Sequence, residues 1–166
     1  MAVVNVKSAA LTNRDATPRV PNLGAIDRAQ MFAARGLATI TSGDSAASVY
    51  RLCTIPSDAI VLAVWKSHPD IGTTTTADIG LYKTTRDGSA VVDADAFTAA
   101  TVLNAGAVNK TDVGHGNLMT VANFEKRVWE LLGLTADPFI DYDVCATLVG
   151  AADGTGALAL EVEYVV

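Results

Sequence analysis

After Gly36 the sequence consists of short apolar segments separated by Gly, Pro, Asp, Asn and Ser, and this pattern constrains the fold most strongly. Segments this short suit strands better than helices, and closely spaced turn residues are typical of an all-β sandwich or barrel. No repeat of about 20 to 50 residues is visible, so a solenoid or propeller is not favoured. The predicted strands are residues 37–41, 49–55, 59–66, 77–83, 140–148 and 158–164.

The periodicity within these segments predicts which faces are buried. Residues 140–148 and 158–164 alternate apolar and polar side chains, which indicates one face toward a core. Their Gly-rich link, residues 150–156, fits a hairpin, so we expect the two strands to pair antiparallel. Residues 59–66 are apolar on both faces, which predicts a strand covered on each side or near the middle of a sheet. In the second strand we expect one shared face for Val49, Arg51, Cys53 and Ile55.

Helical signals are few. Asp93 is a suitable N-cap for a short helix over residues 93–100, and Asn123 is one for a helix over 123–132 that Gly133 would end. Residues 26–34 allow one helical turn at most. The Gly-containing stretch 104–117 is expected to be a loop.

The first 35 residues lack a sustained period of 2 or 3.6. Pro18 and Pro21 disfavour a helix around Arg19, and the polar stretch 13–19 is unable to form a core of its own. We therefore expect two parts: an extended N-terminal arm, residues 1–35, and a β-sandwich domain, residues 36–166. The whole fits one domain of ordinary size.

Charge is divided unevenly between these parts. Residues 1–35 hold five Lys or Arg and two Asp, a charge of +3, so with a total of −6 the remaining residues carry −9. An acidic body is a poor ligand for nucleic acid, whose binding rests on neutralisation of phosphates. A basic arm on an acidic body favours contact with an acidic protein surface, the alternative being an ordinary solvated tail.

No membrane or secretory segment is predicted. The longest apolar run, residues 59–65, is far short of the ~20 residues that span a bilayer. The N-terminus lacks a basic leader followed by an apolar core, so synthesis in the cytoplasm is the simpler expectation. Cys53 and Cys145 lie in apolar strands and are expected to be core residues; the sequence leaves open whether they pair.

No catalytic constellation is evident. His68 and His115 lie in predicted loops, where we expect solvated side chains without an orienting carboxylate and a nucleophile. The pairs Asp93/Asp95 and Asp141/Asp143 lack the pattern of a calcium loop and are read as a helix cap and a solvent face. We expect no enzyme activity, no cofactor and no metal. Trp65 and Trp129 are expected to pack in or beside the core, with sugar stacking as the minor alternative.

Several stretches resemble those of a known family in their order along the chain and in their residue types, and the resemblance covers most of the chain. They are residues 13–19, residues 42–45 leading to 49–52, residues 78–82, residues 129–134 with 137–138, and residues 142–144 before the closing strands. With these stretches the sequence resembles the cement or decoration proteins of tailed-bacteriophage capsids.

That resemblance implies a jelly-roll-like β-sandwich on the capsid exterior that ties neighbouring major capsid proteins together, usually as a homodimer or homotrimer. The arm would then reach across a boundary between capsomers, and the acidic body would face solvent or its symmetry mates. The residues expected to contact the capsid are Asn13, Arg14, Asp15, Pro18, Arg19 and Arg28.

A second hypothesis is a virion-surface module that binds a glycan or host receptor. Its candidate elements are Trp65 and the Thr-rich tract after Gly72. A hydrolase ranks far behind, because no pair of residues resembles a nucleophile and its base. The sequence does not indicate the phage, the host or whether the arm is ordered before assembly.

Overall fold

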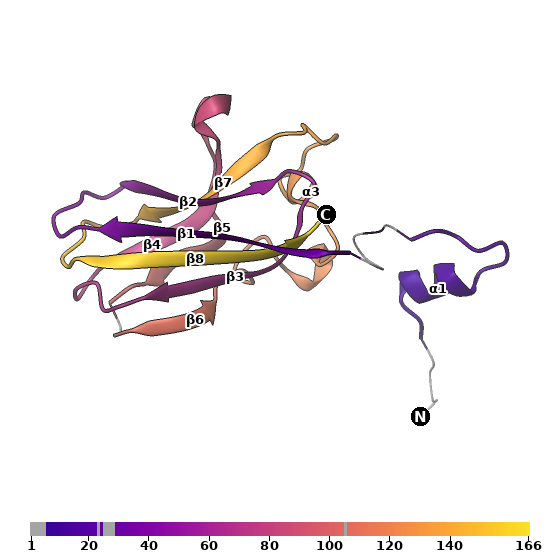
Figure 1. Ribbon diagram of the computed structural model, residues 1–166, viewed down its shortest axis with the longest axis horizontal. Helices are drawn as coiled ribbons and strands as arrows, with labels where there is room; N and C mark the ends of the chain where they lie inside the picture. Colours follow the sequence, from indigo (N-terminus) through magenta and orange to yellow (C-terminus); the bar gives the residue numbers. More distant parts are fainter. Residues whose placement is uncertain (1–5, 23, 25–28, 105) are drawn as a thin grey trace.

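The computed structural model describes residues 6–22, 24, 29–104 and 106–166. Two four-stranded antiparallel sheets face each other, and the arm projects from one end of this sandwich (Figure 1). The β1 sheet has the order β1-β8-β3-β6, and the β2 sheet has the order β2-β7-β4-β5. The strands are β1 (Met31–Ile40), β2 (Val49–Pro56), β3 (Ile60–His68), β4 (Thr76–Lys83), β5 (Val91–Val102), β6 (Val108–Asp112), β7 (Asp141–Leu148) and β8 (Gly156–Val165).

The connectivity is that of a jelly roll. Apart from the step from β4 to β5, each consecutive pair of strands lies in different sheets, so the chain passes back and forth across the core. Eight strands interleaved in this way make the double-sheet jelly roll. The predicted all-β, jelly-roll-like sandwich with short helices is confirmed.

The expected pairing of the last two strands is wrong. β7 pairs with β2 and β4, whereas β8 pairs with β1 and β3 in the opposite sheet. Alternation predicts that a strand has one buried face, but both sheets of a sandwich bury one face on the same core. The pattern therefore identifies the two strands without assigning them to a sheet, and residues 149–155 cross between sheets.

The core follows the predicted faces. Burial alternates along β8 at Leu158, Leu160 and Val162, and β3 lies between β8 and β6 as an inner strand. The expected shared face in β2 is interrupted, because the register shifts between Arg51 and Cys53. This bulge buries both Leu52 and Ile55. The largest fully buried side chains include Phe97, Ile40, Ile55, Ile71, Ile79, Leu81, Leu103, Leu148, Leu158 and Leu160.

Three local predictions fail where tertiary pairing overrides sequence propensity. Residues 93–100 form part of β5, because pairing with β4 outweighs the cap signal of Asp93. The expected loop 104–117 contains β6. Residues 31–34, expected in a helical turn, begin β1, and Ile26 to Arg28 lie outside the described residues.

The predicted helix over 123–132 is much shorter. A 3₁₀ turn, η2 (Val121–Asn123), precedes α3 (Val128–Leu131), whose N-cap is Arg127 rather than Asn123. The N–H of Val128 and the N–H of Trp129 instead donate to the carbonyls of Ala59 and Ser57, which ties this segment to the sandwich. Gly133 ends the helix with a φ of +71°, as expected for a C′ glycine.

The two ends of the sandwich differ. At the arm end, β1 begins, β8 ends, and α3 packs by the β2–β3 turn; the C-terminus lies here too (Figure 1). At the opposite loop end, Asp153 accepts hydrogen bonds from the hydroxyl and N–H of Thr73, the N–H of Thr74 and the hydroxyl of Thr75. None of the helices among the described residues is long and apolar enough to cross a bilayer.

Candidate functional site

The described part of the arm folds into a small hook, residues 8–22. Its helix α1 (Ala9–Asp15) begins at Ser8, whose hydroxyl accepts the N–H of Leu11. Asn22 closes the hook, since its side chain donates to the Ala10 carbonyl at 3.1 Å and accepts from Asn13 Nδ2 at 3.0 Å. These contacts lie within the arm, and α1 buries no side chain. The hook is therefore a folded element that presents its surface outward.

The sequence pattern does not reveal α1, because a helix without a buried face has no apolar period. The one local signal is Ser8, a favourable N-cap residue just before a run of good helix formers. Asn13 and Asn22 matter through their contact with each other, which only the folded chain shows.

Charges on the hook are partly paired. Asp15 accepts from Lys7 Nζ at 2.9 Å and from Arg14 Nε at 2.7 Å. The Arg14 hydrogen bond, followed by that of Lys7, holds the pKa of Asp15 well below its usual range. Arg19 is exposed, and the described residues provide no ion-pair partner for it. Arg35, counted with the arm in the sequence, belongs to β1 and pairs with Glu161.

The predicted contact residues divide accordingly. Arg14, Asp15, Pro18 and Arg19 are exposed on the hook. Asn13 is half-buried, and its amide and carbonyl are used to close the hook, which gives it a positioning role. Arg28 lies outside the described residues.

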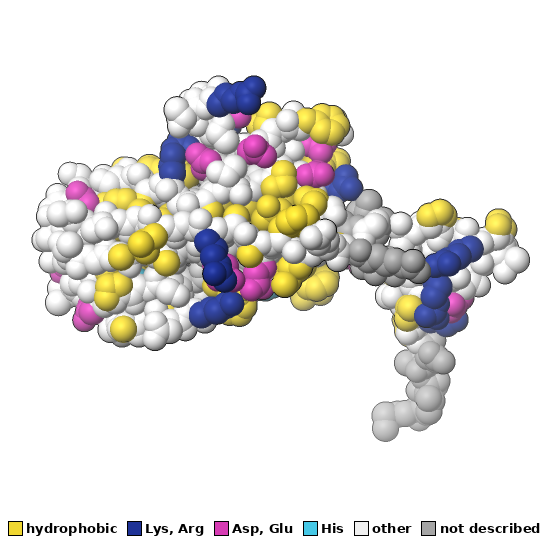
Figure 2. Space-filling model, in the orientation of Figure 1, with side chains coloured by type: hydrophobic (Ala, Val, Ile, Leu, Met, Phe, Trp, Pro, Cys, Tyr) yellow, Lys and Arg dark blue, Asp and Glu magenta, His cyan; other side chains and the backbone are white. Residues whose placement is uncertain are grey.

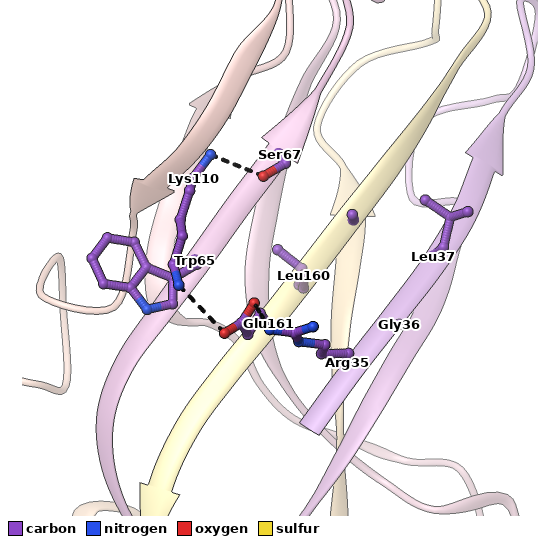
Figure 3. A pocket seen from close by; sticks show the side chains of 9 residues that line it. Arg35, Gly36, Leu37, Trp65, Ser67, Lys110, Leu160 and Glu161 are labelled. Carbon is purple, nitrogen blue, oxygen red and sulfur yellow. Dashed lines mark hydrogen bonds and ion pairs between the residues drawn. The ribbon is translucent and has the colours of Figure 1, made fainter. Parts of the chain in front are cut away.

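A hollow of about 460 Å³ lies on the outer face of the β1 sheet. Leu37 and Trp65 stand on opposite sides of it, and Glu161 lies between Arg35 and Lys110 (Figure 3). Glu161 accepts from Arg35 at 2.9 Å and from Lys110 at 3.5 Å. Hydrogen bonding by Arg35 is the main reason that the pKa of Glu161 is lowered.

This hollow does not assemble the elements of the glycan hypothesis. The Lys110 ammonium lies 5.0 Å from the centre of the Trp65 ring while also contacting Glu161 and Glu163 on β8, so it covers the ring on that side. Residues 72–76 are described and do not line the hollow. The hydroxyls of Thr73 and Thr75 are instead bound to Asp153 at the loop end.

The histidines and cysteines are held in structural contacts. His68 ends β3 and is buried, contrary to its expected place in a solvated loop, and burial lowers its pKa. His115 Nδ1 lies 2.8 Å from Asp112, so the expectation that this histidine lacks an orienting carboxylate is wrong. Cys53 and Cys145 are free thiols whose pKa values burial raises to about 12. Thiols this hard to ionise are poor nucleophiles.

The acidic pairs are engaged locally. Asp93 lies in β5 rather than at a helix cap, and burial, together with a hydrogen bond involving Asp95, raises its pKa. Asp143 accepts from Arg51 at 2.6 Å and from Thr54 at 2.8 Å. Within the described part of the chain, no three His, Cys, Asp or Glu side chains are grouped for metal binding.

Sequence reasoning missed a set of exposed aromatic side chains at the arm end. Phe139 is 89% exposed and Phe124 is 70% exposed. Phe32 lies at the beginning of β1, where the arm joins the sandwich. Single exposed apolar residues carry no sequence signal, because their neighbours are brought together only by folding. Together with the hook, these residues form the candidate interaction surface.

Comparison with known proteins gives structural matches only. No protein-family model matches the chain, and no curated protein matches its sequence. A chain of the cyanophage Pam1 capsid asymmetric unit is similar with a TM-score of 0.55 and 18% identity, over 100% of this chain and 99% of that one. A chain of the capsid of Ralstonia phage GP4 is similar with a TM-score of 0.56 and 17% identity, over 84% and 86%. The chain therefore shares its fold with chains of phage capsids.

Proposed function

We propose that this chain is a virion structural protein that binds the outer surface of a phage capsid and stabilises it by bridging major capsid proteins. The observation that carries the proposal is the similarity to a chain of a phage capsid over the full length of both chains, arm included. A shared fold alone leaves function open. The arm and its charge supply the independent support.

The arm has the properties of a tether. It projects from the sandwich (Figure 1), its hook buries no side chain in α1, and Arg19 is available to an acidic partner. Because Arg35 belongs to β1, the residues before that strand, 1–30, carry a charge of +2 against −8 in the rest, and this difference directs acidic protein surfaces toward the arm. Each contact needs to contribute little, because many copies on one shell act together.

The other chemistry on the chain supports binding rather than catalysis. His68 is buried, and the two thiols are difficult to ionise. Buried thiols with raised pKa values are poor nucleophiles. We infer that the protein acts as a structural component and that it forms a homodimer or homotrimer on the shell.

Deletion of residues 1–22 tests the role of the arm. Wild type and the deletion variant are mixed with undecorated shells, and bound protein is measured by co-sedimentation across a concentration series. We expect the deletion to weaken binding at least tenfold. The matched control is Leu37→Ser in the hollow of the β1 sheet, which should bind as wild type does. Equal binding by the deletion variant would contradict the tether, and absence of binding by wild type would contradict the function.

A further inference from the structure

Exposed aromatic side chains are concentrated at the arm end of the sandwich. The protein has four phenylalanines, of which Phe97 is buried and Phe32, Phe124 and Phe139 are exposed. Phe32 lies at the start of β1, Phe124 lies beside Val61 and Leu131, and Phe139 precedes β7 near Ser57. Large apolar groups on the visible face gather at this end (Figure 2). The large exposed apolar side chains nearer the loop end are aliphatic and include Leu37, Val49, Val102 and Val149.

Phe139 is displayed by a constrained backbone. Its φ is +52°, a left-handed conformation that bulky residues rarely adopt, yet its ring contacts almost nothing. The Phe139 N–H donates to Asp137 Oδ1 at 2.9 Å, and the same oxygen accepts from the Ser57 hydroxyl. The Ser57 N–H in turn donates to the Ile140 carbonyl at 2.8 Å. The fold thus holds the backbone of an exposed aromatic residue in an unfavourable conformation. Such a residue is characteristic of a preorganised contact.

Phe32 extends this apolar surface toward the arm. Its ring stacks on Tyr164, with centroids 5.8 Å apart and 25° between the planes. Tyr164 pairs with Val61 across the sheet, and Val61 shares a small pocket with Phe124. Val61 thus lies next to Tyr164 on one side and lines a pocket with Phe124 on the other, and Met31 beside Phe32 is also exposed. Exposed aromatic clusters of this kind are typical anchors of protein interfaces.

We propose that the sandwich binds the capsid protein through its arm end, with Phe139 and Phe124 as apolar anchors. The hook contacts the capsid protein beside them. The proposal rests on the function proposed above and adds the orientation of the body, loop end outward. The fitting partner surface is apolar where it meets the rings and acidic where it meets the arm, because the arm leaves from this end and carries net positive charge.

A second copy of this chain is a poorer occupant of the arm end. A two-fold contact places the same patch of each copy against the other. Two arms with a charge of +2 each, counted over residues 1–30, would then leave from the same junction and repel each other. An acidic partner of a different kind lacks this conflict.

The test uses full-length variants and binding to undecorated shells. Phe139→Gly removes the ring and suits the left-handed backbone, so its Tm should equal or exceed that of wild type while shell binding weakens at least tenfold. Phe124→Ser should weaken binding further when combined with it. The matched controls are Ala47→Gly, at another left-handed position with φ +65°, and Val149→Ser at the loop end; both should bind as wild type does.

The possible outcomes separate a failure of the arm end as docking face from a failure of the proposed capsid-binding function. If wild type binds and the double variant binds equally well, the arm end is not the docking face, although the capsid-binding function stands. If wild type does not bind, the proposed function fails together with this inference. If the double variant changes the mass of the free protein in light scattering but not its shell binding, the arm end is a contact between copies and the proposal is overturned.

Discussion

Gly36 allows the backbones of β1 and β2, which belong to different sheets, to approach each other closely. It lies in β1 opposite the bulge of β2, where a Cβ at position 36 would come within 1.5 Å of the Leu52 carbonyl oxygen. Neither backbone can move without disturbing a buried neighbour, since Leu52 and Ile55 both enter the core at this point. Glycine is needed here for close approach, and its φ is not left-handed.

Gly36→Ala should therefore be severely destabilising. We expect a loss of at least about 2 kcal/mol in the free energy of unfolding, because the methyl group overpacks a backbone contact. Chemical denaturation measures the loss. Gly150→Ala is the matched control, since a Cβ there meets nothing within 4 Å. A Gly36→Ala protein as stable as wild type would mean that the two strands are further apart than described.

Asp153 connects pH to the order of the loop end. The Thr73 hydroxyl, followed by the N–H of Thr73, the hydroxyl of Thr75 and the N–H of Thr74, holds the pKa of Asp153 well below its usual range. A carboxyl whose pKa is lowered by folding contributes stability above its unfolded pKa, about 3.9, and loses it as pH falls toward the folded value.

Asp153→Asn should accordingly lower Tm near neutral pH, and the difference from wild type should shrink as pH falls below about 4. Thermal unfolding followed at several pH values measures this difference. The control is Asp70→Asn in the same loop region, a residue that accepts none of the Thr73–Thr75 hydrogen bonds. A difference that stays constant down to strongly acidic pH would contradict the role of the ionised carboxylate.

At the scale of single elements, the sequence predicts strands better than their partners. Most of the residues predicted to face inward in β4, β7 and β8 are buried, although Gly80, Tyr82 and Cys145 on the opposite faces are buried too, and the two-faced apolar run of β3 belongs to an inner strand. The failures have a common cause, because β5, β6 and the crossing after β7 are determined by contacts between residues distant in sequence. Short-range cap signals such as Asp93 do not carry that information.

The candidate site was predictable only in part. Composition and charge identify the arm, and Arg14 and Arg19 do lie exposed on it. The closing contact between Asn13 and Asn22 and the display of Phe139 both depend on backbone geometry. Neither a cap pattern nor an apolar period predicts such geometry. The sequence therefore does not single out these residues as clearly as composition and charge identify the arm.

The arm should be independent of the sandwich in stability. Since no side chain of α1 is buried and the hook closes on itself, deletion of residues 1–22 should change Tm by less than about 2 °C. Differential scanning calorimetry compares the two proteins. A fall of Tm by about 10 °C would show that the arm packs on the body and would weaken the interpretation of the deletion as a binding test.

Charge on the hook should affect the affinity for the shell. Arg19→Glu places a like charge against an acidic partner and should weaken binding about tenfold at low ionic strength, with a smaller effect at 0.5 M salt by screening, roughly a 4 Å Debye length. Lys110→Glu, at an exposed position of β6 on the outer face of the β1 sheet, is the control and should have little effect. If both reversals weaken binding equally, net charge rather than the arm is responsible.

The whole molecule combines an acidic jelly-roll body, a positively charged hook and an arm end with exposed aromatic side chains. The hook and the exposed phenylalanines lie toward the same end, while the loop end is held by the contacts of Asp153. This difference between the two ends favours one orientation of the body on a shell, with the arm end toward the shell. The fold itself is shared with chains of phage capsids, and the arm and the aromatic arm end are the features on which the proposed tether rests.

The most direct measurement is a cryo-EM reconstruction of shells, assembled from the major capsid protein of the same phage, after mixing with the full-length protein. The account predicts density for the sandwich on the outer surface, arm end toward the shell, with the hook reaching a second capsid subunit. Shells that remain bare at saturating protein, or sandwich density that contacts a single subunit through the loop end, would contradict it.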